Sequence, residues 1–233
     1  MCGRYVLAED PSLLVSEFGA DFASESFAHA AHRSNFNVSP TTMVPVIRTE
    51  KGGEPIDTSS HRVVDLVRWG ITPRWAPGKS TLLVNARGES VAEKATFKKA
   101  FETSRCIIPA TGYYEWKRPE KDPYFISRAG KSPMALAGLI VTTEVEGLKQ
   151  LACVIITLAA APNIESIHNR MPATISPKNW DDWLDPDVTG ADALMLMDAD
   201  PHLLARPVSR RVNSIRNNDA SLIEPEPHQE RLI

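Results

Sequence analysis

The sequence predicts a mixed α+β fold built on a curved, largely antiparallel β-sheet with short helices at its periphery. Two observations lead to this fold class. The 233 residues contain many short runs of β-branched and apolar residues, and few long helical patterns. The chain also lacks the regular strand–helix alternation of a doubly wound fold. At this length we expect a single domain over residues 1–233, with a C-terminal tail over roughly residues 224–233.

The first predicted elements are one helix and three strands. "DPSLLVSEFG" predicts a short helix, with Asp10 as N-cap, Pro11 in the first turn and Gly19 as its end. Strands are expected where apolar and β-branched residues dominate, at residues 43–48, 62–70 and 81–87. A loop with two prolines and a glycine, "ITPRWAPGKS", separates the last two strands.

The later part of the chain is expected to contain further short helices and strands. Residues 91–104 predict a helix, because Phe97 and Phe101 stand four residues apart with lysines on the other side. "SPKNWDDWLD" predicts another helix, with Ser176 as cap and Pro177 at its first position. Residues 191–199 predict one or two helical turns. Strands are expected at residues 105–110, 113–117, 123–128, 134–142 and 151–157.

Composition limits the class of protein. Hydrophobic residues make up 42% and charged residues 24%, as in ordinary globular chains. No apolar run approaches the ~20 residues of a membrane span, and no signal-peptide pattern occurs. The three cysteines, Cys2, Cys106 and Cys153, form no CxxC pair, which favours a reduced, cytoplasmic protein without disulfides. Cys106 and Cys153 stand in apolar runs and are expected in the core.

Charge is unevenly distributed along the chain. The net charge is −3, yet residues 62–128 carry 13 basic and 7 acidic side chains between two acidic flanks. This stretch is compatible with a phosphate-binding groove and equally with solvated lysines on a helix.

Cys2 is the first candidate for chemistry. Removal of Met1 would give Cys2 a free α-amine next to its thiol, and such an aminothiol can attack one electrophilic carbon twice and close a five-membered ring. The alternative is a frayed terminus with an incidental thiol.

Three further residues stand next to apolar strands. Asn85 could orient a backbone group or an amine, or simply cap a strand end. Glu115 lies between Tyr114 and Trp116, where desolvation by the rings would let it exchange a proton near neutral pH; a lone strand glutamate more often faces solvent. His168 suits proton transfer, although isolated histidines are more often structural.

Motifs for metals and common cofactors are missing from the sequence. The six histidines form no HExxH pattern, and no GxGxxG, GxxxxGK[ST] or GxSxG occurs. We therefore expect no metal and no cofactor.

The ordered motifs together resemble the SRAP family, the SOS-response-associated peptidase-like proteins that shield abasic sites in single-stranded DNA. The resemblance covers nearly the whole chain and rests on "MCGRY", "RWGITPRWA", "NARGES", "RCIIPATGYYEWK", "PYFISRAG", "GLIVTT", "IHNRMP" and "LIEP". It implies the barrel-like SRAP fold and a catalytic set of Cys2, Asn85, Glu115 and His168.

The implied activity is a covalent trap. The Cys2 amine would form an imine with the open-chain aldehyde of the abasic sugar, and the thiol would then close a thiazolidine. AP-lyase and reversal reactions follow from the same chemistry, and the family name implies self-removal of Met1. The implied partner is single-stranded DNA with abasic sites. We expect a monomer that does not associate with a membrane and that acts in the cytoplasm, at damaged DNA in the nucleoid.

DNA contacts are expected next to the catalytic residues. Arginines within two residues of a catalytic residue can hold phosphates, and Trp75 can stack on a base. Trp116 and Trp69 are equally compatible with core packing. The full set of expected contacts is Arg4, Asn37, Pro40, Trp75, Arg87, Trp116, Thr157 and Arg170. Two departures, Ser104 before the middle cysteine and Lys94–Ala95 after "NARGES", put one phosphate contact in doubt.

Two alternatives remain open from the sequence. A class II glutamine amidotransferase also begins with Met-Cys-Gly and uses Cys2 as nucleophile, but Arg4 and the absence of any Asn-Gly pair argue against it. The other is a non-catalytic DNA-binding module in which Cys2 is incidental.

Overall fold

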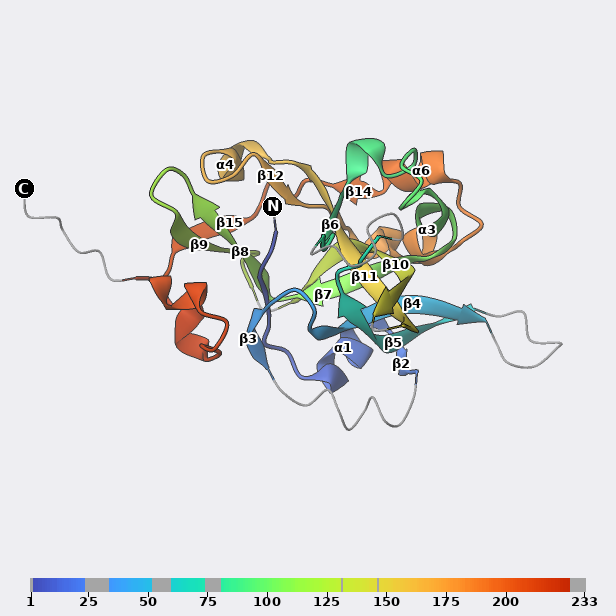
Figure 1. Ribbon diagram of the computed structural model, residues 1–233, viewed down its shortest axis with the longest axis horizontal. Coiled ribbons are helices and arrows are strands. Elements are labelled where there is room, and N and C mark those ends of the chain that lie inside the picture. Colours follow the sequence, from blue (N-terminus) through green and yellow to red (C-terminus); the bar gives the residue numbers. More distant parts are fainter. Residues whose placement is uncertain are drawn as a thin grey trace, which may run out of the picture.

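Two β-sheets form the body of the molecule, with short helices at its margins (Figure 1). The structure is a computed structural model that describes residues 2–23, 34–51, 60–73, 81–130, 132–145 and 147–226. This mixed α+β architecture with a largely antiparallel sheet confirms the predicted fold class.

The larger sheet contains a closed five-stranded barrel. Its strands pair in the order β11-β5-β4-β7-β10, and pairing between β10 and β11 closes the ring. The β5–β11 contact is parallel, whereas the other barrel contacts are antiparallel. The strands are β4 (Met43–Lys51), β5 (Ser60–Trp69), β7 (Arg105–Ala110), β10 (Met134–Val145) and β11 (Leu148–Ala159).

A second, antiparallel sheet lies beside the barrel. Its order is β15-β9-β8-β1-β3, and the central pair, β8 and β1, places Tyr113 opposite Tyr5. Its strands are β1 (Tyr5–Leu7), β3 (Asn35–Val38), β8 (Gly112–Lys117), β9 (Asp122–Ser127) and β15 (Leu204–Pro207).

Short strands extend the barrel sheet. The end of β11 is flanked by β6 (Asn85–Arg87), which runs parallel to it, and by β12 (Arg170–Pro172), which runs antiparallel. This arrangement brings residues near 86 and 170 to the same end of one strand. The remaining strands are β2 (Asp21–Phe22), β13 (Thr174–Ile175) and β14 (Met197–Asp198).

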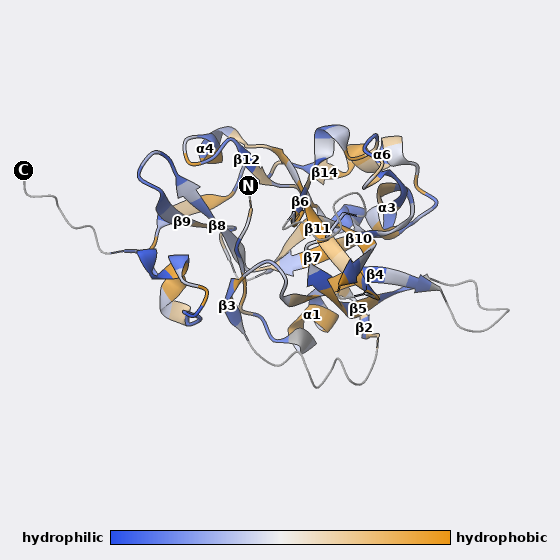
Figure 2. Cartoon of the chain, viewed as in Figure 1, coloured by the Kyte–Doolittle hydropathy of each residue, from blue (hydrophilic) through white to orange (hydrophobic). Residues whose placement is uncertain are grey.

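The core fills the barrel and extends to the second sheet. The barrel strand β11 is among the most apolar parts of the chain (Figure 2). Cys106 and Cys153 are fully buried, as predicted. Trp69 is also fully buried and packs edge-on against Tyr5, with ring centroids 5.2 Å apart. Trp69 is therefore a core residue.

The first helix forms as the sequence predicts. In α1 (Pro11–Phe18) the Asp10 carboxylate accepts a hydrogen bond from the Ser12 N–H, and Gly19 ends the helix with a positive φ of 54°.

Two later helical segments also form, with different details. Ser176 precedes a 3₁₀ turn (Pro177–Asn179) that leads into α5 (Trp180–Leu184), but its side chain makes no capping hydrogen bond. The 191–199 segment contains α6 (Gly190–Met195) and then β14. The remaining short helices are α4 (Pro162–Glu165) and 3₁₀ turns at Gly88–Ser90, Arg210–Asn213 and Ala220–Ile223.

The predicted helix over residues 91–104 is wrong in extent. Only α3 (Lys98–Thr103) is helical, and turns precede it. Val91 and Phe97 are both buried. In a continuous α-helix, positions six residues apart point about 120° away from each other. The turns before α3 instead let both side chains reach the core.

The predicted strand over residues 81–87 is also shorter than expected. Only Asn85–Arg87 run alongside β11, while Leu83 forms an isolated bridge with Ile71. The carbonyl of Val84 accepts hydrogen bonds from the Ile155 N–H and from the indole of Trp69, which anchors the chain just before β6.

At the C-terminal end, the described part of the predicted tail is paired. Pro225 forms a bridge with Val208, and the Glu226 N–H donates to the Pro207 carbonyl. Among the described residues, no helix is both long and apolar enough to cross a membrane.

Candidate active site around Cys2

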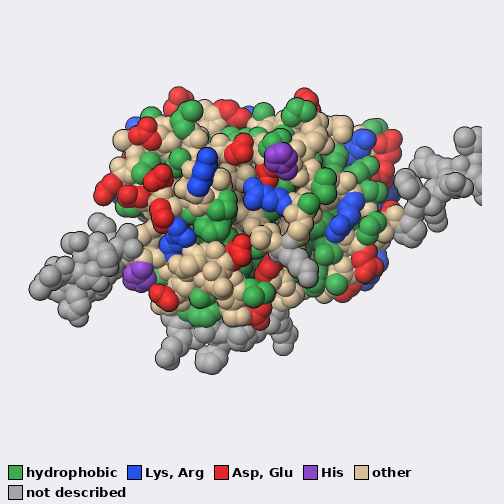
Figure 3. Space-filling view, turned by 180° about the vertical axis from the view of Figure 1, so that it is seen from behind, with side chains coloured by type: hydrophobic (Ala, Val, Ile, Leu, Met, Phe, Trp, Pro, Cys, Tyr) green, Lys and Arg blue, Asp and Glu red, His purple; other side chains and the backbone are tan. Residues whose placement is uncertain are grey.

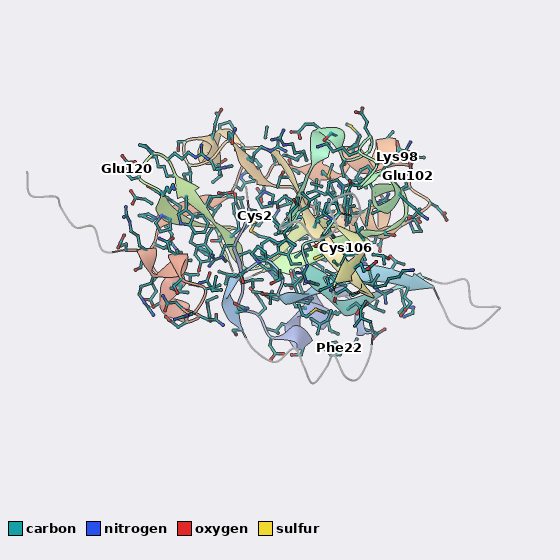
Figure 4. The ribbon with its side chains drawn as sticks, in the orientation of Figure 1. Cys2, Phe22, Lys98, Glu102, Cys106 and Glu120 are labelled. Atoms are coloured by element: carbon teal, nitrogen blue, oxygen red, sulfur yellow. The ribbon has the colours of Figure 1, made fainter. Side chains whose placement is uncertain are left out.

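Cys2 lies near the centre of the molecule, just before β1 and between the two sheets (Figure 4). Its side chain is fully buried. Burial raises the pKa of the Cys2 thiol well above its ordinary value, and the Glu115 carboxylate raises it further, while the backbone N–H of Arg4 acts in the opposite direction. The resting sulfur is therefore a neutral thiol, and its use as a nucleophile requires a base.

Asn85 holds the backbone of Cys2. The Asn85 Nδ2 donates a 2.9 Å hydrogen bond to the Cys2 carbonyl. The other amide atom, Oδ1, is buried and has no hydrogen-bond partner among the described residues. Because β6 is fixed against β11, this amide is a rigid anchor for the N-terminal segment. The structure thus brings Asn85 and Cys2 together, as predicted.

Glu115 and His168 reach the same region from different elements. Glu115 is on β8 and only 3% exposed, and its Oε1 lies 3.8 Å from Nδ1 of His168. His168 follows α4, and the same Nδ1 lies 3.0 Å from the backbone N–H of Arg170 and 3.1 Å from its carbonyl. A neutral ring can accept from that N–H, whereas a protonated ring turns its Nδ1–H toward the carbonyl and Glu115.

The neighbours of Glu115 differ from the sequence interpretation. Side chains alternate along β8, so Tyr113 and Glu115 share one face, whereas Tyr114 and Trp116 face the other side. Tyr114 and Trp116 pack there in a second apolar cluster with Phe125. The rings of Tyr114 and Trp116 therefore do not surround the carboxylate. Glu115 is buried on the opposite face of β8, which also carries Tyr113.

Arg170 is bound to a carboxylate. Its NH1 and NH2 donate to both oxygens of Glu89, and NH2 also donates to the carbonyl of Thr157. The side chain of Arg170 is 15% exposed and that of Glu89 53% exposed. Thr157 is fully buried, whereas Arg87 on β6 is exposed. Sequence reasoning missed Glu89 as the partner of Arg170; the bidentate match between guanidinium and carboxylate is visible only in three dimensions.

Arg4 and Asn37 form a second polar group. Arg4 NH1 donates to Asn37 Oδ1 and to the Val212 carbonyl. The Asn37 Nδ2 donates to the carbonyls of Ser214 and Asn217, which ties β3 to the C-terminal segment. Burial lowers the pKa of Arg4. These contacts fix both side chains within the protein.

The other predicted DNA contacts are placed as follows. Pro40 lies in the turn between β3 and β4 and is partly exposed. Trp116 donates from its indole N–H to Asn213 Oδ1 and lies on the opposite face of β8 from Glu115. Trp75 lies outside the described residues. On the face shown in Figure 3, acidic and basic side chains of the described residues are interspersed.

No group of three or more histidine, cysteine or acidic side chains in the described ranges is arranged to hold a metal ion. Two hollows of about 760 and 570 Å³ lie around Thr103 and Ser104, and neither is lined by the Cys2 group.

Fold and site together define a class of protein: a small α+β barrel in which a cysteine at position 2 lies with an asparagine on β6, a glutamate on β8 and a histidine between α4 and β12. The chain belongs to the SOS response associated peptidase (SRAP) family, whose model matches residues 1–215. The resemblance seen in the motifs is thereby confirmed.

Relatives of known name agree with this assignment. The chain is 33% identical over 234 residues to the abasic site processing protein YoqW of Bacillus subtilis (strain 168), covering 96% of this chain and 99% of YoqW. It is 28% identical over 231 residues to the abasic site processing protein YedK of Escherichia coli (strain K12), covering 97% and 100%. A solved structure from Bacteroides thetaiotaomicron shares the fold, with a TM-score of 0.80 and 20% identity over 97% of this chain and 100% of that one.

Proposed function

We propose that this protein processes abasic sites in single-stranded DNA and bonds covalently to them through both reactive groups of Cys2. The single observation that carries the proposal is the 2.9 Å hydrogen bond from Asn85 to the Cys2 carbonyl, in a buried site that also contains Glu115 and His168. The relatives YoqW and YedK are named abasic site processing proteins, which supports this substrate class.

The first step needs the free amine of Cys2, so Met1 must be removed. The amine attacks the aldehyde carbon of the ring-opened sugar and forms an imine with loss of one water. Asn85 orients this attack, because its Nδ2 fixes the carbonyl of the same residue and its unpaired Oδ1 can accept from the amine. A fixed nucleophile of this kind avoids the entropy of a bimolecular encounter.

The second step closes the ring. The sulfur of Cys2 adds to the imine carbon and its proton passes to Glu115. The electron pair of the carbon–nitrogen double bond returns to nitrogen, which takes up that proton from Glu115, so the carboxylate is regenerated. The product is a thiazolidine. Since burial keeps the thiol protonated, the nearby Glu115 carboxylate supplies the base that this step requires.

In this proposal His168 donates a proton to the sugar oxygen during ring opening and to the hydroxyl that leaves as water. It contacts the backbone of Arg170 and lies 3.8 Å from Glu115, so the two side chains can exchange a proton. The same imine permits a slower β-elimination, which is the AP-lyase reaction. The ring-closing step run backward restores the imine, and hydrolysis of the imine by one water then releases the aldehyde and the free Cys2 amine. Self-removal of Met1, which the family name implies, belongs to this proposal as well. It must precede the first step, because the Cys2 amine is free only afterwards.

DNA binding is assigned to the polar residues around this site. Exposed Arg87 is available for a phosphate, and Arg170 becomes available when Glu89 releases it. We expect a monomer to act on backbone and lesion with little sequence readout.

The experiment is incubation with single-stranded DNA that carries one abasic site, followed by denaturing gel electrophoresis. The wild type should form an adduct stable to heat and SDS, and Cys2→Ala should form none. Cys2→Ser keeps the amine and should give only an imine that borohydride traps. Release of ammonia from glutamine without an adduct would indicate an amidotransferase, and reversible binding alone would indicate a simple DNA-binding module.

A further inference from the structure

Two buried tyrosines next to Cys2 have no role in the chemistry described so far. Tyr5 on β1 and Tyr113 on β8 are directly opposite each other in the antiparallel pair, so their side chains lie on the same face of the sheet. Both side chains are fully buried. Neither hydroxyl has a hydrogen-bond partner among the residues that the structure describes.

An unpaired buried hydroxyl is unusual in a protein core. Leaving such a group without a partner is unfavourable, and a phenylalanine would fill the same space without that disadvantage. The adjacent Tyr114 follows the ordinary pattern, since its hydroxyl donates a 2.8 Å hydrogen bond to the Phe36 carbonyl. An unsatisfied hydroxyl in this position is free to donate to a group that arises during the reaction.

Tyr113 is the better placed of the two for the reacting atoms. It shares one face of β8 with Glu115. It also lies directly opposite Tyr5 on β1, the strand that begins three residues after Cys2. Burial raises the pKa of the Tyr113 phenol well above its ordinary value, and the neighbouring Cys2 and Glu115 side chains raise it further. The phenol therefore keeps its proton. It acts as a neutral hydrogen-bond donor close enough to Cys2 and Glu115 for both to influence its pKa.

Tyr5 is oriented toward a different set of neighbours. Its ring packs edge-on against Trp69, and after burial the largest influence on its pKa is Cys153, followed by Cys2. This places Tyr5 deeper in the core, and we assign the functional role to Tyr113.

We propose that Tyr113 donates a hydrogen bond to the Cys2 sulfur while that sulfur closes the thiazolidine, and so directs the imine to ring closure instead of strand cleavage. This inference rests on the proposed function. During the step the thiol proton passes to Glu115 and the sulfur bears negative charge until the carbon–sulfur bond forms. A donor held against that charge stabilises the transition state in a site without bulk water.

The imine has two fates, and Tyr113 acts on only one of them. Ring closure requires charge on sulfur, whereas β-elimination of the DNA strand requires removal of a proton from the sugar. Loss of the donor should therefore change the ratio of the two products, which a loss of packing or of DNA affinity would not do.

The test compares Tyr113→Phe with Tyr114→Phe on single-stranded DNA with one abasic site. Tyr113→Phe keeps the ring and should fold normally, as melting temperature will verify. We expect the rate of heat-stable adduct formation to fall about tenfold or more in Tyr113→Phe, because hydrogen bonds to charged groups have effects of this size. The borohydride-trapped imine and the cleaved strand should rise at the same time.

Tyr114→Phe removes a hydroxyl from the opposite face of the same strand and should leave the ratio of adduct to cleavage unchanged. An unchanged ratio in Tyr113→Phe, or an equal decrease of both products, would overturn the role of Tyr113 while the wild-type adduct still upheld the proposed function. A wild type that forms no adduct would overturn the proposed function itself. A rise in the pH at which adduct formation reaches half its maximal rate in Tyr113→Phe would support the contact with sulfur.

Discussion

Oε1 of Glu115 lies 3.8 Å from Nδ1 of His168, although one residue is on a strand of the second sheet and the other follows a short helix of the barrel side. The barrel strand β11 fixes one side of this pair, because it binds β12, which begins two residues after His168. The pair lies in the same buried region as Cys2.

Replacement of Glu115 by glutamine tests its role as a proton acceptor. Glu115→Gln keeps the size of the side chain but removes the base, so adduct formation should slow by about 10²–10⁴-fold. Binding to undamaged single-stranded DNA should stay within twofold, as fluorescence anisotropy would measure. Equal losses of binding and adduct formation would instead assign Glu115 to DNA binding.

The ion pair between Arg170 and Glu89 leads to a prediction about DNA affinity: removal of the Glu89 carboxylate should increase it. The Arg170 hydrogen bonds lower the pKa of Glu89, so Glu89 is charged at neutral pH and competes with phosphate for the guanidinium. The pair is partly exposed and worth about 0.2–1 kcal/mol. Glu89→Gln should therefore bind single-stranded DNA about two- to fivefold more tightly.

The control for that measurement is Glu93→Gln, which removes one negative charge from an exposed side chain of the same segment. Titrations at several salt concentrations separate the two effects. If both variants gain affinity equally, net charge is the cause and the release of Arg170 is not.

Alkaline pH should destabilise the fold. Burial raises the pKa of Cys2 and Cys106 and of Tyr5 and Tyr113, so the folded state keeps protons that the unfolded chain releases near pH 8.5 for thiols and about 10 for phenols. Their contribution to stability is complete below those values and falls as the pH rises above them.

Urea unfolding at pH 7, 9 and 10.5 would measure this decline. Cys106→Ala removes one of the titrating groups and should show a shallower loss between the last two values. A free energy of unfolding that stays constant or rises with pH would contradict the assignment of these groups as buried and neutral.

Gly112 is required for close packing at the start of β8. A Cβ atom at this position would lie 2.6 Å from the Ile126 carbonyl oxygen and 2.5 Å from Phe125 Cζ. Because a backbone atom cannot move aside easily, Gly112→Ala should lower the free energy of unfolding by about 1–3 kcal/mol.

Gly190→Ala is the matched control for chemical denaturation. Its added Cβ would approach no closer than 3.6 Å to Phe101, and the residue begins helix α6. Alanine there should be neutral or slightly stabilising. Similar losses in both variants would mean that steric contact at β8 is not the cause.

Local sequence patterns predicted the elements whose signals are local. The N-cap at Asp10 and the helix end at Gly19 depend only on residues within or next to the helix. The apolar run of β11 likewise indicated a buried strand. The prediction of a helix over 91–104 was wrong in extent: only Lys98–Thr103 is helical, while Val91 and Phe97 are buried from the turns before it. Tertiary packing overrode the helical pattern there.

The site divides in the same way. The motifs identified Cys2, Asn85, Glu115 and His168, and the structure gathers them. The sequence did not reveal that Tyr114 and Trp116 lie on the opposite face of β8 from Glu115. Nor did it reveal that Glu89 forms an ion pair with Arg170, or that the Tyr113 hydroxyl has no hydrogen-bond partner among the described residues. Each of these depends on strand register or on contacts between distant segments, which one sequence does not specify.

The most direct test of the central claim is mass spectrometry of the Cys2 peptide isolated from its adduct with abasic DNA. If amine and sulfur both bond to the same sugar carbon, the sulfur will resist alkylation by iodoacetamide, and borohydride will add no mass. Alkylation of the sulfur within the intact adduct, or an adduct that still forms when the Cys2 amine is acetylated, would contradict the account.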